Sequence, residues 1–285
     1  MQQIRFRSYR LLILLCFFGF SQALANEFRS PRVASLGGAG HANPLLNDSV
    51  FQNPSFASFL PVYSWSLNYK ALGEEQGRAY NVSVLDGRSE LFQASAAYTV
   101  RDELTAFHVG VSKKLAPKIT FGIGAKLFYS KNKNRFENTR TMIASATAAP
   151  LGWLQVALIA DNLFTSEATS QLGLERELIL GTKFKFTEKF LVYLDPHARL
   201  HQNFEAEQRS VFGYEAGGEF QIYKDLYFRL GSFKNVAHPE ARNRASGFGY
   251  GIGWVAPRLS FDFAVERVLT PVDRLTHTSG VTLYF

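Results

Sequence analysis

Six histidines are the residues best suited to acid–base chemistry or metal binding in this sequence, but their spacing indicates neither. They are His41, His108, His197, His201, His238 and His277. Their spacing matches no complete zinc motif, and the chain contains neither H-E-x-x-H nor G-x-S-x-G. Asp195-Pro196-His197 could orient one imidazole, but no partner serine stands out. We therefore expect no catalytic residue, no metal, no cofactor and no enzymatic activity.

Charged side chains form a second chemically active set, and they lie on the polar face of runs whose other face is apolar. The main members are Lys126, Lys183, Lys185, Glu215, Glu219, Arg229, Asp262 and Glu266. They predict either a permeation path or ligand site, or an interior in which opposite charges pair. The mixed signs argue against an ion-selective pore, which would cluster one sign of charge.

These charged residues lie on chain that alternates with period two. In residues 245–256, Phe248, Tyr250, Ile252 and Trp254 alternate with four glycines, Gly247 to Gly253. Period two is typical of strands, because successive side chains point to opposite faces. We expect the glycine strip to face inward, where it either receives the N-terminal region or allows the wall to curve.

Similar alternation recurs in fourteen runs from Tyr63 to Phe285. The connections between runs are alternately short and mostly long, and this pattern is typical of membrane barrels but has no reason to occur in a soluble sandwich. Fourteen strands of about 10 residues also fit the available length. The sequence thus predicts an all-β fold, a 14-stranded antiparallel transmembrane β-barrel over residues 62–285. Trp65 and Trp254 are expected in its aromatic girdle.

The first 61 residues do not share this pattern. Residues 1–25 carry three arginines, an apolar run of ten residues from Leu11 to Phe20, and Ala23-Leu24-Ala25, as a cleavable signal peptide does. Its removal would take away the only cysteine, Cys16, and lower the formal net charge from +7 to +4. This charge is too small to predict nucleic-acid binding. Residues 26–61 are rich in glycine and turns, and we expect them to form an N-terminal plug segment.

The plug region carries a family resemblance. Leu36-Gly37-Gly38-Ala39-Gly40, followed by Asn47-Asp48 and Asn53-Pro54, resembles the start of FadL-type outer-membrane proteins, although Ser55 stands where alanine is usual. The C-terminal third is similar to the PorV/PorQ branch of the same superfamily, in 217–220, 226–231, 247–253, 262–264 and 276–285. The resemblance implies a fourteen-stranded barrel with a plug in the outer membrane of a Gram-negative cell. The residues that it places in the plug and along a ligand path are Gly37, Gly38, Gly40, Asp48, Phe51, Asn53, Pro54 and Phe56.

Two functions follow from the resemblance. FadL-type proteins imply passive transport of hydrophobic or amphiphilic small molecules, whereas the PorV branch implies a non-enzymatic component or partner of a protein secretion system. The short chain and modest loops suit the second function at least as well as the first. The expected partners are outer-membrane lipid, the outer-membrane insertion machinery acting on the C-terminal strand and its Phe285, and either a hydrophobic small molecule or a secretion partner.

Overall fold

The computed structural model describes residues 28–72, 77–131, 137–199, 211–239, 241 and 244–285. The expected signal peptide, residues 1–25, lies outside these residues and stays a prediction. Among the described residues, no helix combines the length and the apolar character needed to cross a membrane.

Fourteen antiparallel strands in the described chain form one closed barrel, as the sequence predicted. The strands are β1 (Tyr63–Ala71), β2 (Arg78–Asp86), β3 (Gln93–Arg101), β4 (Leu104–Ala116), β5 (Ile119–Ser130), β6 (Thr139–Leu151), β7 (Leu154–Asp161), β8 (Glu177–Thr187), β9 (Phe190–Arg199), β10 (Val211–Tyr223), β11 (Leu226–Val236), β12 (Ala245–Ala256), β13 (Leu259–Thr270) and β14 (Arg274–Tyr284). β1 pairs with β14 from Ser64–Tyr284 to Ala71–His277, which closes the sheet. Closure gives every strand two partners, so the sheet has no unpaired backbone edge, as a wall in hydrocarbon would require.

The barrel wall is apolar on its outer face. In β12 the glycines are buried, whereas Phe248, Tyr250, Ile252 and Trp254 are between 37% and 51% exposed. Many other large apolar side chains of the strands are exposed in the same way, among them Leu67, Phe121 and Phe263. An outer face of this kind is typical of a wall that contacts hydrocarbon rather than water.

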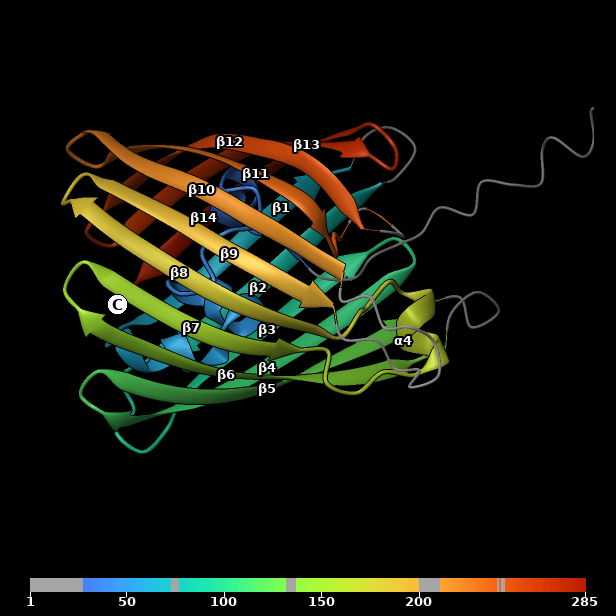
Figure 1. Cartoon of the computed structure of the whole chain (residues 1–285), viewed down its shortest axis with the longest axis horizontal. Coiled ribbons are helices and arrows are strands. Elements are labelled where there is room, and N and C mark those ends of the chain that lie inside the picture. The colour runs from blue at the N-terminus through green and yellow to red at the C-terminus, as the bar shows by residue number, and fades with distance from the viewer. Residues whose placement is uncertain (1–27, 73–76, 132–136, 200–210, 240, 242–243) are drawn as a thin grey trace, which may run out of the picture.

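The two ends of the barrel differ in their connections (Figure 1). The turns at one end are short, as between Ala116 and Ile119 or between Tyr223 and Leu226. The opposite end, which we call the long-loop end, carries helix α4 (Glu167–Gln171) between β7 and β8. Two connections at this end are nevertheless short, 102–103 and 271–273. The second has only three residues, because β13 extends to Thr270 and β14 begins at Arg274.

Residues 28–62, the N-terminal segment, lie inside the barrel (Figure 1). Its short helices are α2 (Pro31–Ser35), η1 (Leu46–Asp48), α3 (Ser49–Gln52) and η2 (Pro54–Phe59). Helix α2 contacts β11 to β14, and η2 contacts β3 to β6, so the segment reaches across the bore from one wall to the other. Most of its side chains are buried, although the sequence lacks any helical or strand period here.

Candidate functional site

Local sequence explains how the N-terminal segment begins. The Ser30 hydroxyl accepts a hydrogen bond from the backbone N–H of Val33 at 3.3 Å, and Pro31 occupies the first turn of α2. Serine is a favoured N-cap, and proline suits the first helical position because its missing N–H has no helical partner. All five residues of α2 are buried against the wall.

Glycine is required where α2 ends. Gly37, Gly38 and Gly40 have φ angles of 65°, 92° and 120°, a region that side chains other than glycine rarely enter. A Cβ on Gly38 would also lie 2.0 Å from Glu215 Oε1. These three predicted residues therefore form the turn that follows α2 beside the wall. Their predicted place on a ligand path stays a prediction.

The wall facing α2 also uses glycine. A Cβ on Gly231 would lie 2.0 Å from the Leu36 carbonyl oxygen, and one on Gly249 would lie 1.9 Å from that of Ala34. A Cβ on Gly251 would meet the Ser35 side chain, whereas those on Gly247 and Gly253 would meet wall residues. The central part of the glycine strip thus makes room for the N-terminal segment.

Two arginines attach the segment to carboxylates of the wall. Arg29 Nη2 lies 2.5 Å from Glu215 Oε1 and its Nη1 lies 2.9 Å from Glu266 Oε1. Arg32 Nε lies 3.1 Å from Glu219 Oε2, and its Nη2 donates to the Tyr193 hydroxyl at 2.8 Å. All these side chains are buried. Buried charges are stable only when they are paired and hydrogen-bonded, so the pairing fixes where the segment sits.

Arg229 extends this network along the wall. Its Nε lies 2.6 Å from Glu219 Oε2 and its Nη1 lies 2.5 Å from Asp262 Oδ1. The five predicted residues of β10, β11 and β13 are therefore all in ion pairs, which form two groups. Glu215 and Glu266 pair with Arg29, whereas Glu219 and Asp262 pair with Arg229. This arrangement matches the expectation that interior charges pair, and it leaves their role in permeation a prediction.

The other predicted lysines lie apart from this network. Lys126 Nζ lies 2.6 Å from Asp161 Oδ1 and is buried. Lys183 is half-buried, and Lys185 pairs at 2.6 Å with the exposed Glu188. Any contribution of these three to a ligand path stays a prediction.

The far side of the segment is held by neutral hydrogen bonds. Asn53 Nδ2 donates to Thr147 Oγ1 at 2.8 Å, and the backbone N–H of Ser55 donates to Ser145 Oγ at 3.0 Å. The Ser55 hydroxyl donates to Asn53 Oδ1 at 2.6 Å, an interaction that alanine would lack. Pro54, between them, begins η2 and lies against Gly124 of β5.

Asp48 is buried between the segment and the wall. Burial raises the pKa of its carboxyl from 3.8 to about 7, and the Ser30 hydroxyl and the Arg32 guanidinium offset part of the effect. The charge of this predicted plug residue is therefore sensitive to pH in the neutral range.

A cavity of about 70 Å³ lies between the segment and the loops of the long-loop end. Its apolar lining includes Phe28, Val33, Phe51, Leu174 and Ile179, and its polar lining includes Arg29, His41, His197 and Glu215. Phe51 thus lies at the cavity, and its place on a ligand path stays a prediction. Phe56 instead packs against Phe59, with ring centroids 5.6 Å apart, and does not line this cavity.

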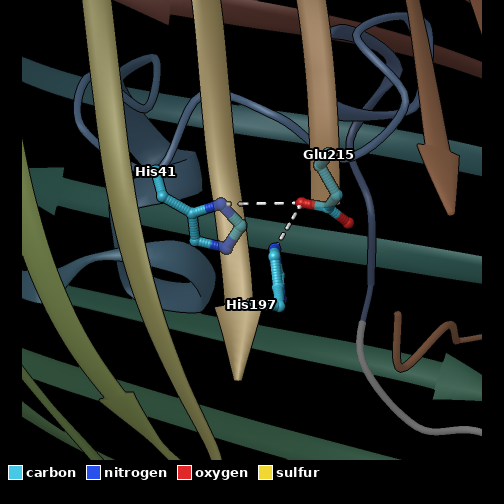
Figure 2. A group of neighbouring side chains, drawn as sticks. All are labelled: His41, His197 and Glu215. Carbon is cyan, nitrogen blue, oxygen red and sulfur yellow. Dashed lines mark ion pairs between the residues drawn. The ribbon is translucent and has the colours of Figure 1, made fainter. Parts of the chain in front are cut away.

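Three polar residues at this cavity form a group that the sequence did not indicate. His41, His197 and Glu215 each present a nitrogen or oxygen within 4.8 Å of the others, and all three are buried (Figure 2). His41 comes from the N-terminal segment, His197 from β9 and Glu215 from β10. More than 150 residues of sequence separate His41 from the other two. Asp195-Pro196-His197 was the only local signal, and it indicated an oriented imidazole without its partners.

The predicted outer-face residues lie near the short-turn end. Trp65 near the start of β1 and Trp254 near the end of β12 are 47% and 43% exposed. Phe285 is exposed; its backbone N–H donates to the Tyr63 carbonyl at 2.9 Å, and its ring packs near that of Tyr63. The positions of Trp65 and Trp254 are compatible with an aromatic girdle, and that of Phe285 with recognition of the C-terminal strand by the insertion machinery. Both roles stay predictions.

Comparisons with known proteins find similarity in structure alone. No protein-family model matches the chain, and a search of curated proteins found no significant match. The structure of the CymD monoaromatic hydrocarbon channel matches with a TM-score of 0.65 and 11% identity, over 94% of this chain and 99% of that one. The structure of the Pseudomonas putida toluene transporter TodX matches with a TM-score of 0.57 and 11% identity, over 93% of this chain and 99% of that one.

A FadL homologue from Pseudomonas aeruginosa is also similar in structure. Its TM-score is 0.59 at 12% identity, over 92% of this chain and 98% of that one. At such low identities the similarity establishes a shared fold. The fold agrees with the resemblance seen in residues 36–54, whereas the PorV/PorQ resemblance has no counterpart among these structures.

Proposed function

We propose that this protein is a passive channel for small hydrophobic molecules in the outer membrane, with the N-terminal segment as a movable plug. The observation that carries the proposal is the position of this segment. It fills the bore of a barrel whose fold is shared with hydrocarbon channels, and an apolar-lined cavity adjoins it at the long-loop end. On this proposal, the long-loop end faces outside and the short turns face the periplasm, as is usual for such barrels.

The cavity supports a ligand of modest size. Phe28, Val33, Phe51 and Ile179 offer an apolar surface to a hydrophobic ligand, and Arg29, which also lines the cavity, is paired with Glu215 and Glu266. An engineered apolar cavity of about 150 Å³ holds benzene, so the 70 Å³ found here is too small for an aromatic ring. A ligand must therefore displace side chains or the segment itself.

The contacts of the segment indicate which side can release it. The charge network on β10, β11 and β13 is buried and costly to separate. The hydrogen bonds of Asn53 and Ser55 to β6 are neutral and can be exchanged for bonds to water. We infer that the segment opens by leaving β6 while the two arginines remain attached.

The secretion-partner alternative is less well supported. The structures named above are described as channels and transporters, and the PorV/PorQ resemblance is confined to short motifs. Crosslinking in intact outer membranes would reveal a stable protein partner if this alternative holds.

A reversible crosslink tests the channel proposal. Ser55 Oγ and Thr147 Oγ1 lie 2.7 Å apart, so cysteines at both positions place their sulfur atoms close enough to form a disulfide with little movement. The only cysteine of the sequence, Cys16, lies in the predicted signal peptide. We expect Ser55→Cys/Thr147→Cys to lose toluene uptake in liposomes when oxidised and to regain it when reduced.

Each single cysteine variant, treated with the same oxidant, is the control and should transport normally. Uptake that is equal in the oxidised and reduced double variant would contradict opening at β6. Absence of toluene uptake by the wild-type protein would contradict the transport proposal itself.

A further inference from the structure

The cluster of His41, His197 and Glu215 has the composition of a transition-metal site (Figure 2). Two imidazoles and a carboxylate are the ligands that Zn²⁺ and similar divalent ions prefer, whereas Mg²⁺ and Ca²⁺ favour oxygen. His197 Nε2 lies 3.4 Å from Glu215 Oε2, and His41 Nδ1 lies 3.6 Å from the same oxygen. Two ligand atoms about 2.1 Å from one tetrahedral zinc ion lie about 3.4 Å apart. The spacing therefore suits a single ion.

Two of these atoms are buried without a hydrogen bond. His197 Nε2 and Glu215 Oε2 lie 3.4 Å apart, within ion-pair range when the imidazole is protonated but without the geometry of a hydrogen bond. Buried charges are stable when they are paired or coordinate a metal. A bound cation would be coordinated by both atoms in place of the imidazole proton, and the adjoining cavity of about 70 Å³ gives it room.

Surrounding residues hold these ligands in the required orientation. His197 Nδ1 lies 3.0 Å from Glu177 Oε2, which directs Nε2 toward the cluster. Arg29 binds Glu215 through Oε1 and leaves Oε2 free to face the imidazoles. A carboxylate on the second nitrogen of a metal-binding histidine is the usual supporting arrangement.

Further carboxylates adjoin the cluster. Glu177 and Asp195 lie beside His197 and His41, and the guanidiniums of Arg29 and Arg244 pair with Glu215 and Glu177. Asp195 Oδ2 lies 2.9 Å from His41 Nδ1 and accepts from the backbone N–H groups of Gly40 and His41, so a fourth oxygen lies beside the proposed ion.

We propose that His41, His197 and Glu215 bind one divalent transition-metal ion of the Zn²⁺ type, beside Asp195. Because His41 belongs to the N-terminal segment whereas His197 and Glu215 belong to β9 and β10, the ion ties the segment to the wall. Metal binding does not depend on the transport proposal. Only its consequence, a channel held closed by the ion, rests on that proposal.

Equilibrium dialysis with Zn²⁺ tests the site. The protein is purified with a histidine-free tag, stripped with a chelator and dialysed against Zn²⁺ at pH 7.5. We expect one bound ion per chain, and an affinity at least about tenfold lower in His197→Gln and in Glu215→Gln. Co²⁺ should give the visible spectrum of a tetrahedral nitrogen–oxygen site in the wild type and lose it in both variants.

The matched control is His108→Phe, since His108 is buried in the same bore between Phe51 and Phe128 but lies outside the cluster. It should bind Zn²⁺ as the wild type does, and electrophoretic mobility before and after heating verifies that each variant is folded. Substoichiometric binding by the folded wild type, or unchanged affinity in folded His197→Gln, would overturn the proposal. Failure of toluene uptake would bear on transport alone and leave these results as they stand.

Discussion

At the scale of single residues, Arg29 and Arg32 decide where the N-terminal segment lies. Each bridges to a carboxylate of the wall from inside the bore, and Arg29 reaches both β10 and β13. Removing one partner of a buried pair leaves an uncompensated charge, which costs far more than the pair contributes in net stability. These arginines therefore specify position, and the neutral contacts on the other side allow movement.

Asp48 gives this attachment a pH dependence. The pKa of its carboxyl is raised from 3.8 to about 7, mainly by burial, so the folded protein binds a proton more tightly than the unfolded chain does. Its stabilising contribution is complete below the unfolded pKa and is lost as the pH rises through about 7. We expect the urea midpoint of the wild type to fall between pH 5 and pH 8 by more than that of Asp48→Asn.

The difference between the two proteins isolates Asp48, because the remaining titratable groups are common to both. Equal changes of midpoint in the wild type and Asp48→Asn would show that this carboxyl does not titrate between pH 5 and pH 8.

At the scale of elements, the wall is shaped by what lies inside it. Strand β6 extends from Thr139 to Leu151, and serine, threonine and alanine alternate along its residues 144–148. Ser145 and Thr147 point inward and bind the segment, so their small hydroxyl side chains are explained by this contact. β11 and β12 make the corresponding room with glycine.

Replacing Gly231 with alanine should disturb this fit. The new methyl group would lie 2.0 Å from the Leu36 carbonyl oxygen, between two backbones that cannot easily separate. We expect Gly231→Ala to lower the free energy of unfolding by about 1–3 kcal/mol, as overpacking of a filled interior does. Urea titration in lipid vesicles measures this change.

Gly152→Ala is the matched control, because no atom lies within 4 Å of the added methyl group. A Gly231→Ala variant as stable as Gly152→Ala would mean that the segment does not press against β11.

At the scale of the whole molecule, the barrel is defined by an apolar outside and a filled inside. Leu67 lies at the middle of β1 and is 59% exposed on the outer face. Arginine at the membrane midplane of a barrel costs about 2–4 kcal/mol, whereas near an interface it costs about 0–1 kcal/mol. We expect Leu67→Arg to lose about 2–4 kcal/mol of unfolding free energy in lipid vesicles.

Leu91→Arg provides the comparison, since Leu91 is 72% exposed in the connection between β2 and β3 at the short-turn end. If both variants were equally stable, the outer face of β1 would not be in hydrocarbon.

The sequence by itself determined the wall of this protein. Alternation with period two is a local property, and the regular alternation of connection lengths predicts an antiparallel closed barrel without knowledge of any distant contact. The positive φ angles at Gly37, Gly38 and Gly40 were likewise signalled by local composition, since glycine clusters mark turns.

Only the tertiary structure decided what the interior residues contact. The pairing of Arg29 with Glu215 joins positions 186 residues apart, and the cluster of His41, His197 and Glu215 draws on three separate elements. No spacing along the chain encodes such contacts, because they depend on strand register and on how the segment lies across the bore. The physical reason is that these residues approach one another only when the strands have closed into a barrel around the N-terminal segment.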